Sequence, residues 1–233
     1  MFGWLRKKKK PELSVADQAR LYSMPAPAPI GEQALSQQRF VVVDLESTGL
    51  NFTKDKILSI GAVVIENQAI NLGQQLDRTL NREHKVSESV LIHQLAPSEV
   101  AAGVRTEDGM LDFLEFVGDS PLLAFHADFD QNLLIREFKD IFSYNFRHHF
   151  FDLAEICPML YPQHEMRNPR MDDWVEFFGL QVLQRHNACA DALATAELML
   201  ILLHKCQAGG IHTLKDLDVS LNNWRRRQGS KMG

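Results

Sequence analysis

Apolar residues in the first part of the chain gather in short β-branched runs, a pattern typical of strands. Residues 39–45 and 57–65 are too short for helices and apolar enough to predict buried strands. Residues 69–80 are more polar, which favours a third strand nearer the edge of a sheet. The polar residues 66–68 predict a hairpin turn between the second and third strands. Such short connections predict an antiparallel start to the sheet.

Further along the chain the apolar positions recur at helical spacing, interrupted by two short apolar runs. The runs at 121–125 and 150–153 predict two more strands. The helical pattern predicts helices over residues 87–95, 106–117, 128–138, 153–161, 171–178, 188–206 and 214–224, with Thr106 as the cap of the second. Strands first, followed by alternating strands and helices, predict an α/β fold with a mixed β-sheet flanked by helices.

The two ends of the chain differ in composition from its middle. The first ten residues end in four lysines, and residues 12–22 predict a short helix. After that helix, prolines alternate with other residues over 24–29, which is typical of an extended linker. We therefore expect three regions: a basic, proline-rich and flexible leader over 1–38, one domain over 39–206, and a helical, basic tail over 207–233. The tail, which includes three consecutive arginines, is assigned to packing or to solvent.

Composition sets limits on the kind of protein. The 233 residues carry a formal net charge of -5, which argues against a broad DNA-coating surface but not against an enzyme that grips one strand end. Three scattered cysteines form no zinc-type pair, so reduced thiols and a cytoplasmic location are expected. The most apolar run, 188–203, includes acidic residues and is short for a membrane span, which predicts a buried helix.

Two carboxylates stand where the first predicted strand ends. Asp44 and Glu46 are two residues apart, so strand alternation points both side chains to the same face. Two acids on one face repel each other and resist burial, and a divalent cation removes both costs. Thr48 and Gly49 then turn the chain and bring backbone N–H groups beside the acids. Taken alone, this motif favours two exposed acids without a function. Two further acidic motifs favour a metal site instead.

The second motif lies where the fourth predicted strand passes into a helix. Asp128 and Asp130 both fall near the N-terminus of that helix, where negative charge is favourable. We assign Asp128 as the N-cap, which leaves Asp130 to face the end of the sheet, a common place for ligand sites.

The third motif joins His186 to Asp191, five residues later. Residues five apart on one helix do not share a face, so the two side chains converge only if His186 precedes the helix and Asp191 lies in its first turn. Asn187 between them is a good N-cap, which supports that arrangement.

With these motifs in order, the chain resembles the DEDDh (DnaQ-like) exonucleases, the family of the polymerase III epsilon proofreading subunit and of ribonuclease T. The resemblance covers about residues 40–203 and rests on Asp44-Leu45-Glu46-Ser47-Thr48-Gly49-Leu50, on Phe129-Asp130, and on His186 with Asp191. Each motif alone is weak, but three in order are highly specific. The chain departs from the family at Leu45 and Ser47, where Thr is usual, and at Phe125-His126, where His-Asn is usual.

The resemblance implies a metal-dependent 3′–5′ exonuclease that releases nucleoside 5′-monophosphates from a single-stranded or frayed 3′ end. It implies that Asp44, Glu46, Asp130 and Asp191 hold two divalent cations, Mg²⁺ or Mn²⁺, and that His186 is the general base. It also implies substrate contacts from Thr48, Gly49, Leu50, His93, Phe125 and His126.

Two other classes of function stay open at this point. One is a catalytically weak module on the same fold that binds nucleic acid or protein, which a missing acid or His would favour, although none is missing. The other is a hydrolase of small nucleotide diesters. The sequence does not distinguish DNA from RNA. It includes no obvious polymerase-binding tail, which favours a stand-alone enzyme over a polymerase subunit.

Overall fold

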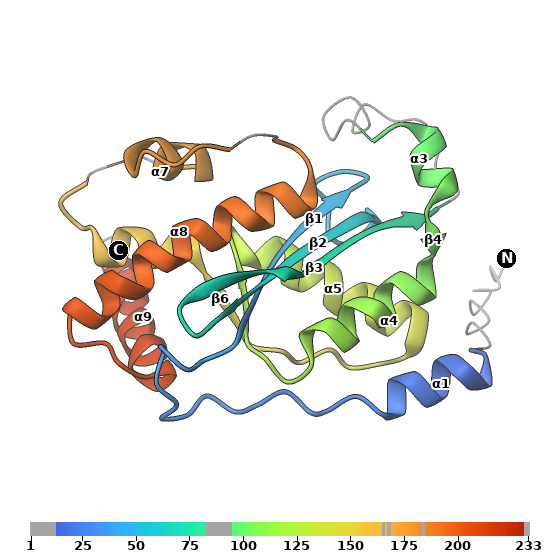
Figure 1. Cartoon of the computed structure of the whole chain (residues 1–233), viewed down its shortest axis with the longest axis horizontal. Helices are drawn as coiled ribbons and strands as arrows, with labels where there is room; N and C mark the ends of the chain where they lie inside the picture. Colours follow the sequence, from blue (N-terminus) through green and yellow to red (C-terminus); the bar gives the residue numbers. More distant parts are fainter. Residues whose placement is uncertain (1–12, 83–94, 165, 167–168, 183–184, 231–233) are drawn as a thin grey trace, which may run out of the picture.

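A six-stranded mixed sheet forms the centre of the molecule (Figure 1). The computed structural model describes residues 13–82, 95–164, 166, 169–182 and 185–230. The strands are β1 Phe40–Ser47, β2 Ile57–Glu66, β3 Ala69–Asn81, β4 Val104–Arg105, β5 Leu122–Ala124 and β6 Phe150–Asp152, in the order β4-β3-β2-β1-β5-β6. The pairs β1–β2 and β2–β3 are antiparallel, whereas β5 and β6 run parallel to β1. The predicted mixed sheet with an antiparallel start is confirmed.

Helices cover both faces of this sheet (Figure 1). They are α1 Val15–Tyr22, α3 Pro97–Ala102, α4 Thr106–Val117, α5 Ala127–Phe142, α6 Leu153–Leu160, α7 Met171–Phe177, α8 Ala188–Ala208 and α9 Leu214–Gly229. Alternate residues of β1 serve the two faces. Val41 and Val43 pack with α4 and α5, and Phe40 and Val42 pack with α6, α8 and α9.

Most of the predicted elements are present, with a few differences. The expected helix over 87–95 falls almost wholly outside the described residues, and the short elements α3 and β4 were not predicted. Thr106 does not cap α4, because its hydroxyl donates instead to the carbonyl of Asn81 at 2.9 Å. The apolar run at 188–203 lies in the buried helix α8, and within the described parts of the chain no helix is long and apolar enough to cross a membrane.

Helix α8 begins in direct contact with the backbone of β2. A Cβ atom at Gly61 would lie 2.0 Å from the carbonyl carbon of Ala188, the first residue of α8. Gly61 also stands opposite Asp44 in the β1–β2 register. The absence of a side chain at this position therefore lets α8 start close to the strand that carries the first acidic motif.

Residues 13–38 lie against the domain, which departs from the expected separate, flexible leader. Buried Asp17 of α1 accepts two hydrogen bonds from Arg105, at 2.6 and 3.0 Å. Leu35 is buried in the core, and its N–H donates to the carbonyl of His212. These contacts join segments far apart in the sequence, which local composition does not predict. The basic run at residues 1–10 lies outside the described residues.

Replacing Asp17 with Asn is expected to destabilise the protein by about 1–3 kcal/mol, because Arg105 loses a buried, charge-assisted partner. The hydrogen bonds from Arg105 lower the pKa of Asp17 to about 2, from 3.8. The stabilisation is thus complete above the unfolded value and is lost as pH falls through about 2. Urea denaturation at pH 7 measures the loss. The matched control is Asp108→Asn, which removes the exposed partner of Arg105. Equal stability of both variants would contradict this role for α1.

Candidate active site

Three acids meet where β1 ends. Asp44 and Glu46 on β1 and Asp191 on α8 each offer a carboxylate oxygen, and these oxygens lie within 4.8 Å of one another. Glu46 and Asp191 are only 5% and 6% exposed. The strand alternation that placed Asp44 and Glu46 on one face is thus borne out, and the register with Gly61 brings α8 to them.

A fourth acid reaches the same place from α5. Asp130 is buried in the first turn of this helix, directly after β5. Asp128 is exposed and makes no cap, contrary to expectation, because His126 occupies the N-cap position with a left-handed φ of 60°. The side chain of His126 makes no cap hydrogen bond, and Asp130 is left to face the other acids as expected.

The electrostatics of the cluster favour a cation. Burial, and then the charges of Asp130 and Glu46, raise the pKa of Asp44 well above its ordinary value. Burial, and then the charges of Asp152 and Glu46, raise the pKa of Asp130 likewise. Buried carboxylates that repel one another are the donor set that divalent cations bind. The residues present therefore fit a divalent metal site.

The start of α8 has the arrangement that the sequence predicts. His186 precedes the helix, Asn187 is the N-cap and accepts from the N–H of Ala190 at 3.0 Å, and Asp191 lies in the first turn. His186 is exposed and has a φ of 60°, and its backbone N–H donates to Asp191 at 3.0 Å. The histidine is thus tied to the acidic cluster through its backbone, while its ring is open to solvent.

Arg185 is a neighbour that sequence reasoning missed. Its guanidinium pairs with Asp191 and also with Asp172 of α7, the latter at 2.8 Å. Burial raises the pKa of Asp191, and Arg185 opposes that rise. Its position directly before His186 was the only signal in the sequence, and a lone arginine in a loop is a weak one.

Asp152 is a fifth acid that sequence reasoning did not place in the site. It ends β6, accepts from the N–H groups of His126 and Ala154 at 2.9 and 2.8 Å, and caps α6. Its charge acts on Asp130, and burial raises its own pKa. Its place at the end of a predicted strand was visible in the sequence. The pairing of that strand with β5, which brings Asp152 beside the site, was not.

The loop after β1 has a fixed shape. The Thr48 hydroxyl donates to Asp55 at 2.8 Å, and the Thr48 N–H donates to the carbonyl of Lys56, so neither group is turned to the acids. A Cβ atom at Gly49 would lie 2.7 Å from the Asp55 carboxylate. Leu50 is 87% exposed, which leaves its apolar side chain available at the mouth of the site.

A buried ion cluster on α5 supports this loop. Glu137 is fully buried and pairs with Lys56 at 2.9 Å, with Arg136 at 3.2 Å, and with Arg82. Arg136 also donates to the carbonyl of Asp55. Because α5 carries Asp130 in its first turn, the same helix positions one acid and the loop opposite it.

The remaining expected substrate contacts lie at the β5–α5 junction or outside the described residues. The rings of Phe125 and His126 meet edge to face with centroids 4.9 Å apart, next to Asp152. His93 lies outside the described residues.

The fold and the acidic cluster together define a ribonuclease H-like α/β protein with acids at the strand ends. A sequence model of the family described as Exonuclease matches residues 41–199, so the chain belongs to this exonuclease family. Its relatives include the PolC-type DNA polymerase III of Caldanaerobacter subterraneus subsp. tengcongensis, 30% identical over 197 residues. That match covers 84% of this chain and 14% of the polymerase, so the chain spans only a small part of such relatives.

Solved structures of E. coli exonuclease I share the fold. One holds a dT13 oligonucleotide and has a TM-score of 0.62 at 16% identity, covering 74% of this chain and 42% of that one. A zinc-bound form in complex with single-stranded DNA has a TM-score of 0.59 at 17% identity, covering 70% of this chain and 40% of that one.

Proposed function

We propose that this chain hydrolyses single-stranded DNA from the 3′ end and releases nucleoside 5′-monophosphates. The observation that carries the proposal is the meeting of Asp44, Glu46 and Asp191 within 4.8 Å, with buried Asp130 beside them. Four acids from one strand end and two helix starts repel one another, and a divalent cation between them would offset that repulsion.

We infer that the four acids hold two divalent cations, Mg²⁺ or Mn²⁺. Carboxylates are the ligands that these hard cations prefer, and the raised pKa values of Asp44 and Asp130 reflect a repulsion that positive charge relieves. When bound, the ions supply Lewis-acid stabilisation of the phosphoryl oxygens and lower the pKa of a bound water. Asp191, which pairs with Arg185 in this structure, would give up that contact to hold a cation.

His186 is the residue that we propose as general base. Its ring is exposed at the edge of the acidic cluster, and its backbone N–H is held by Asp191 at 3.0 Å. Imidazole exchanges a proton near neutral pH, so it can accept one from the attacking water. We assign the exposed side chain of Leu50 to packing against the terminal base, and Gly49 to the tight turn that the neighbouring Asp55 carboxylate requires.

The relatives support DNA as the substrate. The family matches include DNA polymerases, and structures of exonuclease I hold single-stranded oligonucleotides. The likeness supports DNA as the substrate. Because this chain covers only 14% of such a polymerase, the likeness carries no argument about polymerase binding.

Matched DNA and RNA oligonucleotides, labelled at the 5′ or the 3′ end, test the proposal with Mg²⁺, Mn²⁺ or EDTA. A ladder that shortens from the 3′ end of DNA, with 5′-mononucleotides as products and no cleavage in EDTA, is the expected result. Shortening from the 5′ end would overturn the polarity. Hydrolysis of a nitrophenyl nucleotide diester without cleavage of any oligonucleotide would instead identify a small-diester hydrolase.

A further inference from the structure

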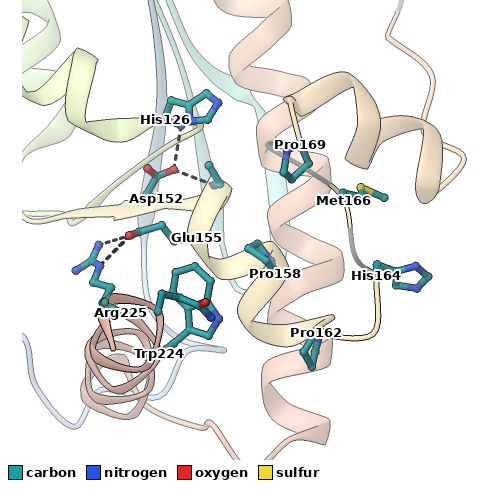
Figure 2. A pocket seen from close by; sticks show the side chains of 13 residues that line it. His126, Asp152, Glu155, Pro158, Pro162, His164, Met166, Pro169, Trp224 and Arg225 are labelled. Carbon is teal, nitrogen blue, oxygen red and sulfur yellow. Dashed lines mark hydrogen bonds and ion pairs between the residues drawn. The ribbon is translucent and has the colours of Figure 1, made fainter. Parts of the chain in front are cut away.

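A large cavity lies beside the acidic cluster, and neither the four acids nor His186 lines it. Its volume is about 920 Å³, and Figure 2 shows the side chains that line it. They come from the β5–α5 junction, the end of β6, α6 and the segment after it, and the last turns of α9. The lining includes His126, Asp152, Pro158, Pro162, Trp224 and Arg225.

The cavity borders the candidate active site. Asp152 and His126 line it, and the N–H of His126 donates to Asp152 at 2.9 Å. The charge of Asp152 acts on Asp130, one of the four acids. The cavity therefore lies beside the acidic cluster, next to the end of β6.

The walls of the cavity suit nucleobases. Trp224, three prolines and His164 offer flat or apolar surfaces, and aromatic rings are the surfaces on which unpaired bases stack. Gln228 of α9 adds an amide that can donate and accept hydrogen bonds with base edges. The combination is unlike a purely apolar groove for a protein helix.

The two acids in the lining are already compensated. Glu155 pairs with Arg225, whose Nε lies 2.9 Å from the carboxylate, and Asp152 accepts two backbone N–H groups. Arg226 and Arg227 follow on α9 and are exposed. Neither of these two arginines is part of the lining, so the cavity offers a nucleic acid strand walls whose acids are already compensated and do not repel its phosphates.

We propose that this cavity binds the single-stranded segment upstream of the 3′-terminal nucleotide, with a base stacked on Trp224. The inference rests on the proposed function, because it extends that substrate beyond the scissile bond. It assigns α9, which lies beyond the matched family region 41–199, a role in gripping longer strands.

Gly229 provides a way to fill the cavity without breaking the fold. It lines the cavity at the end of α9, and a Cβ atom there would meet nothing within 4 Å. Gly229→Phe therefore obstructs the cavity, and Trp224→Leu removes the stacking surface. The matched controls are Ser230→Phe, at the next residue but outside the lining, and Tyr22→Leu, an exposed aromatic on α1.

The binding experiment uses the full chain with Asp44→Asn, so that no probe is consumed. Fluorescence anisotropy with 5′-labelled dT10 and dT2 measures affinity for a long and a minimal strand. We expect both cavity variants to weaken binding of dT10 roughly 5- to 100-fold, and much more than binding of dT2. Gly229→Phe does so because it obstructs the cavity, and Trp224→Leu because it removes the stacking surface. Both controls should match the parent protein.

Several outcomes separate this inference from the proposed function. If wild type degrades oligonucleotides while both cavity variants bind dT10 like the controls, the cavity inference fails and the proposed function stands. Equal weakening of dT2 and dT10 would also overturn it, since the cavity would then not be an upstream site. If dT10 binding depends on the cavity but no oligonucleotide is hydrolysed, the proposed function fails and the binding site stands.

Discussion

Asp44→Asn is expected to lower the rate of oligonucleotide hydrolysis by more than about 100-fold while the protein stays folded. The substitution keeps the shape of the side chain but removes a charged donor from the cluster that holds Glu46 and Asp191. Residues that merely support metal ligands already cost about 10–100-fold when replaced. The rate with Mg²⁺ and with Mn²⁺ measures the effect, and Asp128→Asn, an exposed acid near the same site, is the matched control.

The same substitution should stabilise the metal-free protein. The pKa of Asp44 is raised above 3.8, so its stabilising contribution is present at low pH and is lost as pH rises through the folded value. Metal-free wild type should therefore lose stability as pH rises above 3.8 through the folded value, and Asp44→Asn should show a smaller slope. Thermal melts in EDTA measure both. Near wild-type turnover of Asp44→Asn, or an unchanged pH slope, would remove Asp44 from the site.

His186→Ala is expected to lose on the order of 10²–10⁴-fold in rate while it binds Mn²⁺ nearly as well as wild type. A general base takes a proton from water and holds no cation, so only the chemical step should suffer. The pH–rate profile of the variant should lack the inflection that the general base gives the wild type. A metal-bound water can still give an inflection of its own.

Calorimetric titration with Mn²⁺ and a pH–rate profile on single-stranded DNA test both halves of this expectation. The matched control is His204→Ala, which removes an exposed histidine from α8, the helix that His186 precedes. Parallel loss of metal binding and activity would make His186 a ligand or a structural residue. Full activity would leave the acids without this base and would favour the binding-module or small-diester functions.

The four acids could be predicted because each depends on a local rule. Strand alternation places Asp44 and Glu46 together, and a helix start places Asp191 after Asn187. The caps of α4 and α5 were predicted less well, because tertiary contacts decide them. The hydroxyl of Thr106 turns to β3, and Asp152 takes the N–H of His126.

The missed residues depend on contacts between distant segments. Arg105 meets Asp17 across 88 residues, and no periodicity in the leader indicates this pairing. Asp152 joins the site only because β6 lies beside β5 in the sheet order. Sequence patterns describe one element at a time, so they predict the residues on each strand and helix better than the contacts between them.

Gly61 has no functional group, but the position of the candidate active site depends on it. A methyl group there would have to move the start of α8 from 2.0 Å to the 3.4 Å of ordinary contact, and His186 and Asp191 would move with it. A misplacement of about 1 Å can cost 10²-fold in rate. The position of His186 and Asp191 relative to β1 therefore depends on the missing side chain at Gly61 of β2. A substitution at Gly61 would therefore lower the rate as if a catalytic group had been lost, and rate measurements alone would not distinguish the two.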